Sequence, residues 1–156
     1  MSKLQVGDKA PEFEMADGDG KVWSLSELRG KKVILYFYPA DDTPGCTAEA
    51  CDFRDSQAGL HEAGYVVLGV SPQGAESHKK FSTKYSLNFP LLVDEDLRAA
   101  RAYGAAGDGG LFKGLPLRVK RCTFVIDEEG NIEQALYGVR AKGHVAQLKE
   151  SLGVGV

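Results

Sequence analysis

The chain has 156 residues, three cysteines, a formal net charge of −3 and ordinary fractions of hydrophobic and charged residues, which is typical of a globular protein of one domain. We therefore expect a single domain over residues 1–156. The small negative charge gives no electrostatic basis for binding nucleic acid or an anionic membrane surface. No segment has the length and apolarity of a signal peptide or of a membrane helix, so we expect a soluble, cytoplasmic protein that does not bind membranes.

Predicted strands and helices alternate along the chain. Two continuous apolar, β-prone runs, 33–38 and 65–70, are typical of strands buried on both faces. Between them, residues 44–63 carry helix formers and are followed by Gly64, a common helix end. The other expected elements are, in chain order, a strand or turn over 22–25, a helical turn over 26–30, a helix over 74–85, a strand over 90–93, a helix over 94–103, strands over 123–126 and 132–137 joined by a turn over 127–131, and a helix over 142–152.

This order of elements predicts an α/β fold with a central mixed β-sheet flanked by helices. A β-α-β unit followed by a hairpin and a last helix matches the thioredoxin-like plan. The sequence contains no internal repeat, no low-complexity segment and no linker that would divide it.

The segment PADDTPGCTAEAC, residues 39–51, carries the strongest chemical signal. Pro44 suits the first position of a helix because it lacks an N–H, and Thr43 before it is a typical N-cap. Cys46 then falls in the first helical turn, where free backbone N–H groups and the helix dipole favour a thiolate. The alternative is a small buried apolar side chain. Redox chemistry requires that Cys46 be held as a thiolate and be reachable from solvent.

The spacing between Cys46 and Cys51 constrains any bond between them. On an intact α-helix, five residues place the two Cα atoms ~8.6 Å apart and point the side chains about 140° away from each other. A disulfide needs Cα atoms within about 7 Å and facing Cβ atoms. If these cysteines form a bond, the first turns of the helix must therefore unwind.

Two other kinds of cysteine site fit less well. Structural zinc sites use two paired ligand motifs, and His61, His78, His144 and Cys122 supply no second pair. The three histidines lie in polar helical segments, where we expect solvated side chains. The C-x-x-C motif of a thioredoxin-type disulfide reductase is absent. We therefore expect no bound metal and no cofactor.

Residues 37–55, FYPADDTPGCTAEACDFRD, closely resemble the peroxiredoxins, and within them the bacterioferritin comigratory protein or peroxiredoxin Q subfamily. Pro39, Thr43 and Cys46 match the Pro-x-x-x-Thr-x-x-Cys motif of peroxiredoxin active sites. The continuation Cys-Thr-x-Glu-Ala-Cys is typical of the subfamily. Matching segments extend over most of the chain: GDKAPEF (7–13), LSELRGKKV (25–33), NFPLLVD (88–94) and RCTFVID (121–127).

The resemblance implies a thioredoxin fold and the reduction of hydrogen peroxide and alkyl hydroperoxides without a metal or prosthetic group. It implies that Cys46 is the peroxidatic cysteine, whose thiolate attacks the O–O bond and becomes a sulfenic acid. Cys51 matches the resolving position, which gives an intramolecular disulfide. Thioredoxin or a similar dithiol donor would then reduce that disulfide by exchange.

Four further positions match roles in the family. Thr43 matches a hydroxyl that hydrogen-bonds the thiolate and the peroxide, and Pro39 matches a residue that shields the site from water. Arg121 matches the guanidinium that holds the thiolate and orients the peroxide, although without the resemblance it reads as a surface arginine. Glu49 matches an acidic residue near that arginine. Because an intramolecular resolving cysteine needs no second subunit and the subfamily is mostly monomeric, we expect a monomer.

The chain departs from the family pattern in two places. Cys122 stands where serine or threonine is common. Because side chains alternate along a strand, it should face away from Arg121 and Thr123 as a buried, inert cysteine, with a second resolving cysteine as the alternative. The glycine-rich loop 104–120 replaces bulkier residues beside the site. The alternative function is a redox-sensing or chaperone-like module that forms the disulfide with little turnover.

Overall fold

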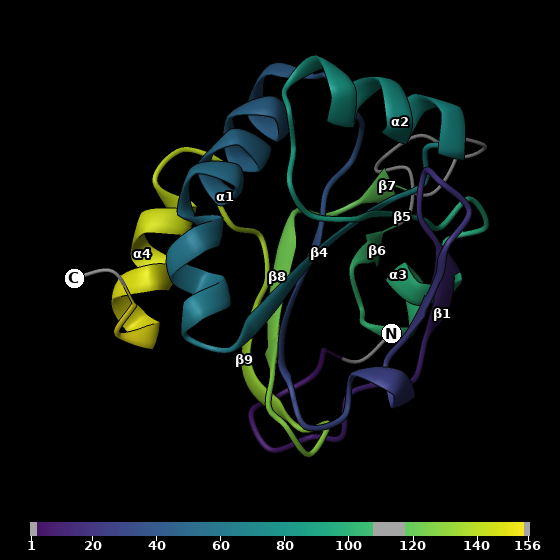
Figure 1. Ribbon diagram of the computed structural model, residues 1–156. Helices are drawn as coiled ribbons and strands as arrows, with labels where there is room; N and C mark the ends of the chain where they lie inside the picture. Colours follow the sequence, from purple (N-terminus) through teal and green to yellow (C-terminus); the bar gives the residue numbers. More distant parts are fainter. Residues whose placement is uncertain (1–2, 108–117, 155–156) are drawn as a thin grey trace.

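A computed structural model describes residues 3–107 and 118–154 of the chain (Figure 1). Most of the glycine-rich loop, residues 108–117, lies outside the described residues. The elements in chain order are β1 Glu14–Ala16, β2 Val22–Ser24, the 3-10 turn η1 Ser26–Leu28, β3 Lys32–Phe37, α1 Pro44–Glu62, β4 Tyr65–Ser71, α2 Ala75–Lys84, β5 Leu91–Val93, α3 Arg98–Ala102, β6 Ala106–Gly107, β7 Arg118–Val119, β8 Cys122–Ile126, β9 Ile132–Leu136 and α4 His144–Leu152.

Five strands form the central sheet in the order β5-β4-β3-β8-β9. β3, β4 and β5 run parallel, β8 runs antiparallel to β3, and β9 runs antiparallel to β8. In the register of β3, Val33 pairs with Val66 on one side and with Ile126 on the other. This is the mixed, thioredoxin-like sheet that the order of elements predicts, and the apolar runs over 33–38 and 65–70 are confirmed as its two innermost parallel strands.

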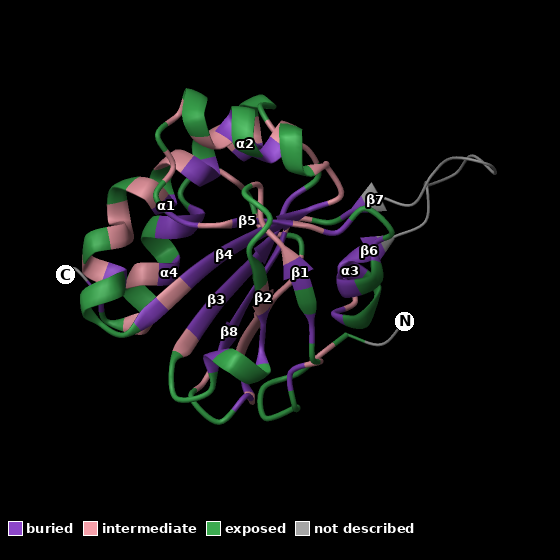
Figure 2. Ribbon diagram, turned by 45° about the vertical axis from the view of Figure 1, so that its right-hand side comes forward, coloured by how far each residue is buried: buried purple, intermediate pink, exposed green. Residues whose placement is uncertain are grey.

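Helices and loops cover the sheet on both faces, so its strands are buried (Figure 2). α1, α2 and α4 pack on one face, where Phe53, Phe81 and Leu148 join a cluster with Ile34 and Tyr36 of β3. The β1–β2 hairpin, η1 and α3 cover the other face (Figure 1). Because the side chains of β3 alternate between these two clusters, the strand needs apolar residues at every position from Val33 to Phe37.

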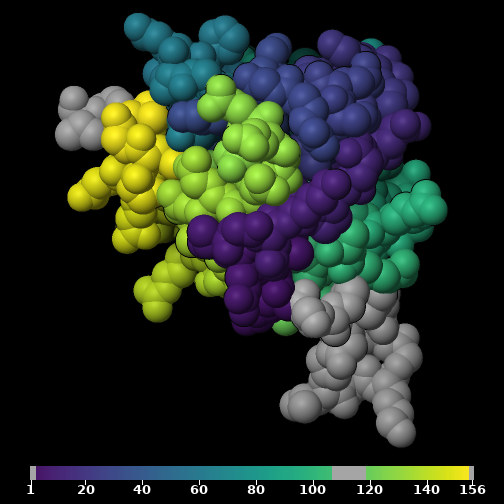
Figure 3. Space-filling model, turned by 90° about the horizontal axis from the view of Figure 1, so that it is seen from below, coloured from purple at the N-terminus to yellow at the C-terminus, as the bar shows by residue number. Residues whose placement is uncertain are grey.

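The N-terminal segment is hydrogen-bonded to the turn and the last strand of the β8–β9 hairpin. Gly7 N donates to Ile132 O at 2.8 Å, and Ile132 N donates to Asp8 O at 2.7 Å. Ala10 N donates to Gly130 O at 2.9 Å in the same region. These bonds lay the segment beside the β8–β9 hairpin, as the space-filling view from below shows (Figure 3).

The helix expected over 94–103 is shorter in the structure. α3 begins at Arg98, because Leu97 adopts a left-handed conformation with φ of 60°. The carboxylate of Asp94 accepts hydrogen bonds from Ala99 N at 3.0 Å and Ala100 N at 2.9 Å. Asp94 therefore satisfies the first free amides of α3 from a turn outside the helix, and the residues between them belong to that turn.

None of the helices in the described part of the chain is long and apolar enough to cross a membrane.

Gly69 of β4 lies between Tyr36 of β3 and Leu91 of β5, which leave no room for a side chain. A methyl group there would lie 3.0 Å from Tyr36 Cε1 and 2.9 Å from Leu91 Cδ2. The ring of Tyr36 is stacked on Phe53, with centroids 4.6 Å apart, and cannot move aside. We expect Gly69→Ala to lower the free energy of unfolding by about 1–3 kcal/mol, as measured by chemical denaturation.

Gly59 in α1 is the matched control. A methyl group there would lie 3.7 Å from Val154 Cγ1, an ordinary contact distance. Because alanine is a better helix former than glycine, we expect Gly59→Ala to raise the free energy of unfolding by about 0.5–1 kcal/mol. Equal effects of the two substitutions would contradict the close packing at Gly69.

Candidate active site

The first turn of α1 is built as the sequence predicts. Thr43 occupies the N-cap position with an extended backbone, Pro44 follows at the first helical position, and Thr47 N donates to Thr43 O at 2.8 Å. One detail differs: the Thr43 side chain does not cap the helix, because its Oγ1 donates to Ala40 O at 2.9 Å. The hydroxyl oxygen is therefore free to accept a further hydrogen bond.

The side chain of Arg121 joins this turn to the start of β8. Its Nη2 donates to Cys46 Sγ at 3.3 Å, and its Nη1 donates to Glu49 Oε1 at 2.7 Å. Only 16% of the side chain is exposed, which rules out a surface arginine. The structure thus brings together three of the expected site residues that lie up to 75 positions apart in the chain.

The 3.3 Å contact between Arg121 Nη2 and Cys46 Sγ depends on Gly45, the residue before the cysteine. A methyl group at Gly45 would lie 3.1 Å from Arg121 Nη2 and 3.6 Å from Ala141 Cβ. A larger side chain would push the guanidinium away from the helix. Gly45 therefore allows the arginine to lie directly against the turn that carries the sulfur.

The electrostatics favour a positive charge on Arg121. Burial opposes that charge, but Glu49 and Cys46 outweigh the effect and raise the pKa of the guanidinium above its usual value. A permanent cation in hydrogen-bond contact with a sulfur stabilises the thiolate over the thiol.

Glu49 is fully buried, and only one of its two carboxyl oxygens has a hydrogen-bond partner among the described residues. Its side chain has 0% exposure, and Oε2 accepts no hydrogen bond from any residue that the structure describes. Burial raises the pKa of Glu49 to about 7, and the contact with Arg121 only partly opposes this effect. Near neutral pH this carboxyl group can therefore hold or release a proton inside the site.

Cys46 is less accessible than the sequence reading requires. Only 2% of the residue is exposed, and it belongs to the apolar cluster under α1. The neighbouring Pro39, Thr43 and Pro44 are exposed, so the loop and first turn around the sulfur border solvent. The sulfur therefore has little exposed surface of its own, and the way to it from solvent runs past this loop and turn.

The three cysteines are free thiols in different surroundings. Cys51 is half-buried in α1, which is helical throughout residues 44–62, so the spacing argument applies and the helix must open before Cys46 and Cys51 can join. Cys122 is fully buried in the cluster on the opposite face of the sheet, as the alternation predicts, and burial raises the pKa of its thiol.

Two histidines expected to be solvated are buried, which corrects the sequence reading. His144 Nε2 lies 2.8 Å from Thr123 Oγ1, and burial, followed by the charge of Arg121, lowers the pKa of His144. His78 lies under α2 and contacts a carboxylate. The missed signal is helical spacing, because Phe81 and Leu148 lie three and four residues after these histidines and mark the buried faces of their helices.

Tyr36 is another buried polar group that the sequence did not single out. Its hydroxyl has no hydrogen-bond partner among the described residues. Burial, followed by the charges of Glu49 and Cys46, raises its pKa. The phenol therefore lies within electrostatic reach of Glu49 and Cys46.

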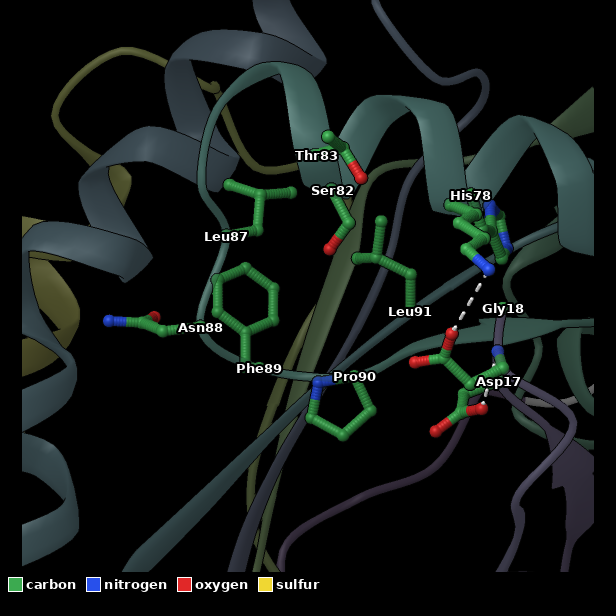
Figure 4. A pocket seen from close by; sticks show the side chains of 12 residues that line it. Asp17, Gly18, His78, Ser82, Thr83, Leu87, Asn88, Phe89, Pro90 and Leu91 are labelled. Carbon is green, nitrogen blue, oxygen red and sulfur yellow. Dashed lines mark hydrogen bonds and ion pairs between the residues drawn. The ribbon is translucent and has the colours of Figure 1, made fainter.

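The candidate site is identified by its side chains and their contacts, because it does not lie in the hollow of Figure 4. A hollow of about 480 Å³ lies between α2 and the chain before β5, lined by residues such as Ser82, Leu87 and Phe89 (Figure 4). None of Cys46, Glu49 and Arg121 lines it. Within residues 3–107 and 118–154 there is also no group of three or more histidine, cysteine and acidic side chains that could hold a metal ion.

Comparison with known proteins places the chain among thiol peroxidases. The AhpC/TSA family matches residues 6–135. Peroxiredoxin Bcp of Bacillus subtilis is 42% identical over 149 residues, which cover 96% of this chain and 95% of that protein. The solved structure of a cysteine-to-serine variant of PrxQ from Xylella fastidiosa has a TM-score of 0.90 at 26% identity and covers 98% of both chains.

A second solved structure carries a statement of activity. Bacterioferritin comigratory protein of Xanthomonas campestris, described for its alkyl peroxide reduction activity, has a TM-score of 0.86 at 32% identity and covers 90% of each chain. The chain belongs to the AhpC/TSA family; peroxiredoxin Bcp is more than 40% identical over nearly the whole length, and the chloroplastic peroxiredoxin Q of Triticum aestivum is 47% identical over 84% of this chain. The resemblance found in the sequence is thereby confirmed.

The raised pKa of Glu49 makes stability depend on pH. The folded state keeps this carboxyl group protonated up to about pH 7, whereas the unfolded chain ionises it near its usual value of 4.5. Between those values the folded state binds more protons, so the contribution of Glu49 to stability falls as the pH rises.

We expect the free energy of unfolding of wild type to fall by about 3 kcal/mol relative to Glu49→Gln between pH 4.5 and 8. Glutamine keeps an oxygen that accepts from Arg121 and does not titrate. Denaturant unfolding of both proteins across this pH range measures the difference. A constant gap between the two curves would show that Glu49 is ionised throughout.

Proposed function

We propose that this chain reduces hydrogen peroxide and alkyl hydroperoxides through Cys46, with Cys51 as the intramolecular resolving cysteine and thioredoxin or a similar dithiol as the reductant. The observation that carries the proposal is the 3.3 Å contact between Arg121 Nη2 and Cys46 Sγ at the start of α1. Membership in a peroxidase family supports the reaction class.

In the first step the Cys46 thiolate attacks the terminal oxygen of the hydroperoxide. An S–O bond forms, the O–O bond breaks, and the departing oxygen takes a proton to leave as water or an alcohol. The guanidinium of Arg121 and the free amides of the first helical turn are fixed donors beside the place where negative charge moves from sulfur to oxygen. Thr43, whose hydroxyl oxygen is free to accept, orients the peroxide O–H, and Pro39 limits the entry of water.

In the second step the thiol of Cys51 condenses with the Cys46 sulfenic acid, and water is released as the disulfide forms. Because α1 holds the two residues apart, its first turns must unwind for this step. Glu49 lies between the two cysteines, so the unwinding also removes its carboxylate from Arg121. The dithiol reductant then takes over the disulfide by exchange and restores both thiols.

Single substitutions separate the two steps. We expect Cys46→Ser to abolish peroxide consumption, because serine at this position is neither a thiolate nor oxidised by peroxide. We expect Cys51→Ser to consume about one equivalent of peroxide and then to stop cycling with thioredoxin, because no disulfide forms. Peroxide consumption and intact mass after one equivalent of peroxide measure both outcomes.

Cys122→Ser is the matched control, since Cys122 lies on the other face of the sheet. We expect it to cycle like wild type, with peptide mapping of the wild-type disulfide linking residues 46 and 51. Normal cycling of Cys51→Ser would show that Cys122 or an external thiol resolves the sulfenic acid. Oxidation of wild-type Cys46 at the slow rate of a free thiol would favour a redox-sensing module with little turnover.

We infer that the protein is cytoplasmic and acts as a monomer. Both cysteines of the proposed cycle lie in the same helix, so the cycle needs no second subunit. Sedimentation velocity at micromolar concentration is expected to give a single species of about 17 kDa, given the chain mass of 16.8 kDa. A stable dimer at this concentration would contradict the inference.

A further inference from the structure

The loop between β3 and α1 is anchored by a buried carboxylate that no part of the proposed cycle uses. Asp41 lies in this loop, and only 3% of its side chain is exposed. Its Oδ1 accepts from Tyr38 Oη at 2.6 Å. Its Oδ2 accepts from Ser77 Oγ at 2.7 Å and lies 2.7 Å from His78 Nδ1. One carboxylate thus joins the loop to the end of β3 and to the first turns of α2.

The partner of this carboxylate is a histidine with acceptors on both sides. His78 is 1% exposed, and its Nε2 lies 2.8 Å from Leu92 O in β5. Burial alone would raise the pKa of Asp41, but the hydrogen bonds from His78, Tyr38 and Ser77 outweigh it and hold the pKa below its usual value. Because an ionised carboxylate and a carbonyl oxygen only accept, both ring nitrogens of His78 must donate, and the ring carries a positive charge.

This buried pair sits next to a backbone position that needs support. Asp42 has a φ of 58°, a left-handed conformation that is unfavourable for a residue with a side chain. Thr43, the N-cap of α1, follows at once, and Cys46 lies three residues further. The conformation at Asp42 therefore sets the direction in which the chain enters α1, and a shift there moves the sulfur relative to Arg121.

The outer side of the loop has a weaker attachment. The carboxylate of Asp42 accepts from Lys84 Nζ at 2.8 Å and from Tyr85 Oη at 2.7 Å, but both Asp42 and Lys84 are exposed. Exposed ion pairs contribute little because water screens them. The buried contact of the Asp41 carboxylate is therefore the stronger of the two side-chain attachments.

We propose that Asp41 and His78 form a buried ion pair that positions the loop before α1, and through it Cys46, for attack on the peroxide. The inference rests on the proposed function, and it makes both residues positioning residues, since neither touches the sulfur in the structure. Loss of the contact to Asp41 should misplace the first turn of α1, and errors of about 1 Å in such an arrangement can slow a reaction by about a hundredfold.

Two substitutions of the same histidine separate its two hydrogen bonds. The amide nitrogen of asparagine takes the place of Nδ1 and can still donate to Asp41, whereas that of glutamine takes the place of Nε2 and can donate to Leu92 O. His78→Asn and His78→Gln thus each lose the ring charge and one hydrogen bond. Only the second loses the bond to the active-site loop.

The rate constant for oxidation of Cys46 by hydrogen peroxide is the first measurement, with the melting temperature of each variant beside it. We expect Cys46 to be oxidised at least about tenfold more slowly in His78→Gln than in wild type, and in His78→Asn at a rate within about threefold of wild type. The two variants should have similar melting temperatures. Lys84→Met, at the exposed attachment, is the control and should react like wild type. Equal rates of the two His78 variants would overturn the proposal.

Amide hydrogen exchange over residues 41–47 gives a second readout that does not depend on activity. We expect faster exchange in His78→Gln than in His78→Asn, because only the former frees the loop. If wild-type Cys46 reacts slowly, the proposed function fails, and the exchange rates still decide about the ion pair. If neither His78 variant folds, Asp41→Asn, which cannot carry the negative charge of the pair, decides: faster exchange over 41–47 and slower oxidation support the proposal, and wild-type values overturn it.

Discussion

The guanidinium of Arg121 lies between two acceptors, the sulfur of Cys46 and the buried carboxylate of Glu49, and the reactive end of the fold is organised around it. A buried cation is stable only when acceptors surround it, and a buried carboxylate only when donors do. Arg121 therefore depends on the sulfur and on the carboxylate as its acceptors, and the first turns of α1 carry both of them.

The burial of Cys46 opposes the second step of the proposed cycle, in which the disulfide forms. Cys46 and Ala50 pack into the apolar cluster under α1, which stabilises the intact helix, but the bond to Cys51 requires this part of the helix to open. Opening exposes apolar surface and separates Glu49 from Arg121. The half-satisfied Glu49 lowers the cost, because a carboxyl group that can take up a proton near neutral pH leaves the ion pair more easily than a permanently charged one.

Much of the site could be predicted from the sequence because its core is local. Thr43, Pro44 and Cys46 define a helix start by their own conformational preferences, and the apolar runs around them place that start at the end of a buried strand. The contact of Arg121 with Cys46 spans 75 positions, and only the resemblance to a family supplied it. Periodicity and spacing carry no information on such distances.

The features that the sequence missed depend on long-range packing or on very short elements. β1, β6 and β7 have two or three residues each, too few for a period to be recognised. His78 follows a run of polar residues that reads as an exposed helix, and its burial depends on Asp41 and on Leu92 O, which reach it from other parts of the fold. Helical spacing can indicate the burial of His78, but it cannot identify the carboxylate that pairs with it, which lies 37 positions away.

The contacts of Arg121 and Asp41 hold the start of α1 from opposite sides of β3 within the sheet. Arg121 reaches it from the position directly before the antiparallel strand β8. Asp41 ties the loop before α1 to His78 of α2, which in turn contacts Leu92 O of β5. Both contacts are charged and buried, so removing one partner from either leaves an uncompensated charge, and small displacements are strongly resisted. The first turn of α1 is therefore held rigidly at its N-terminal end while Glu49 provides a releasable contact one turn later. This arrangement fits a site that must hold one sulfur still for the attack on peroxide and then let the helix open.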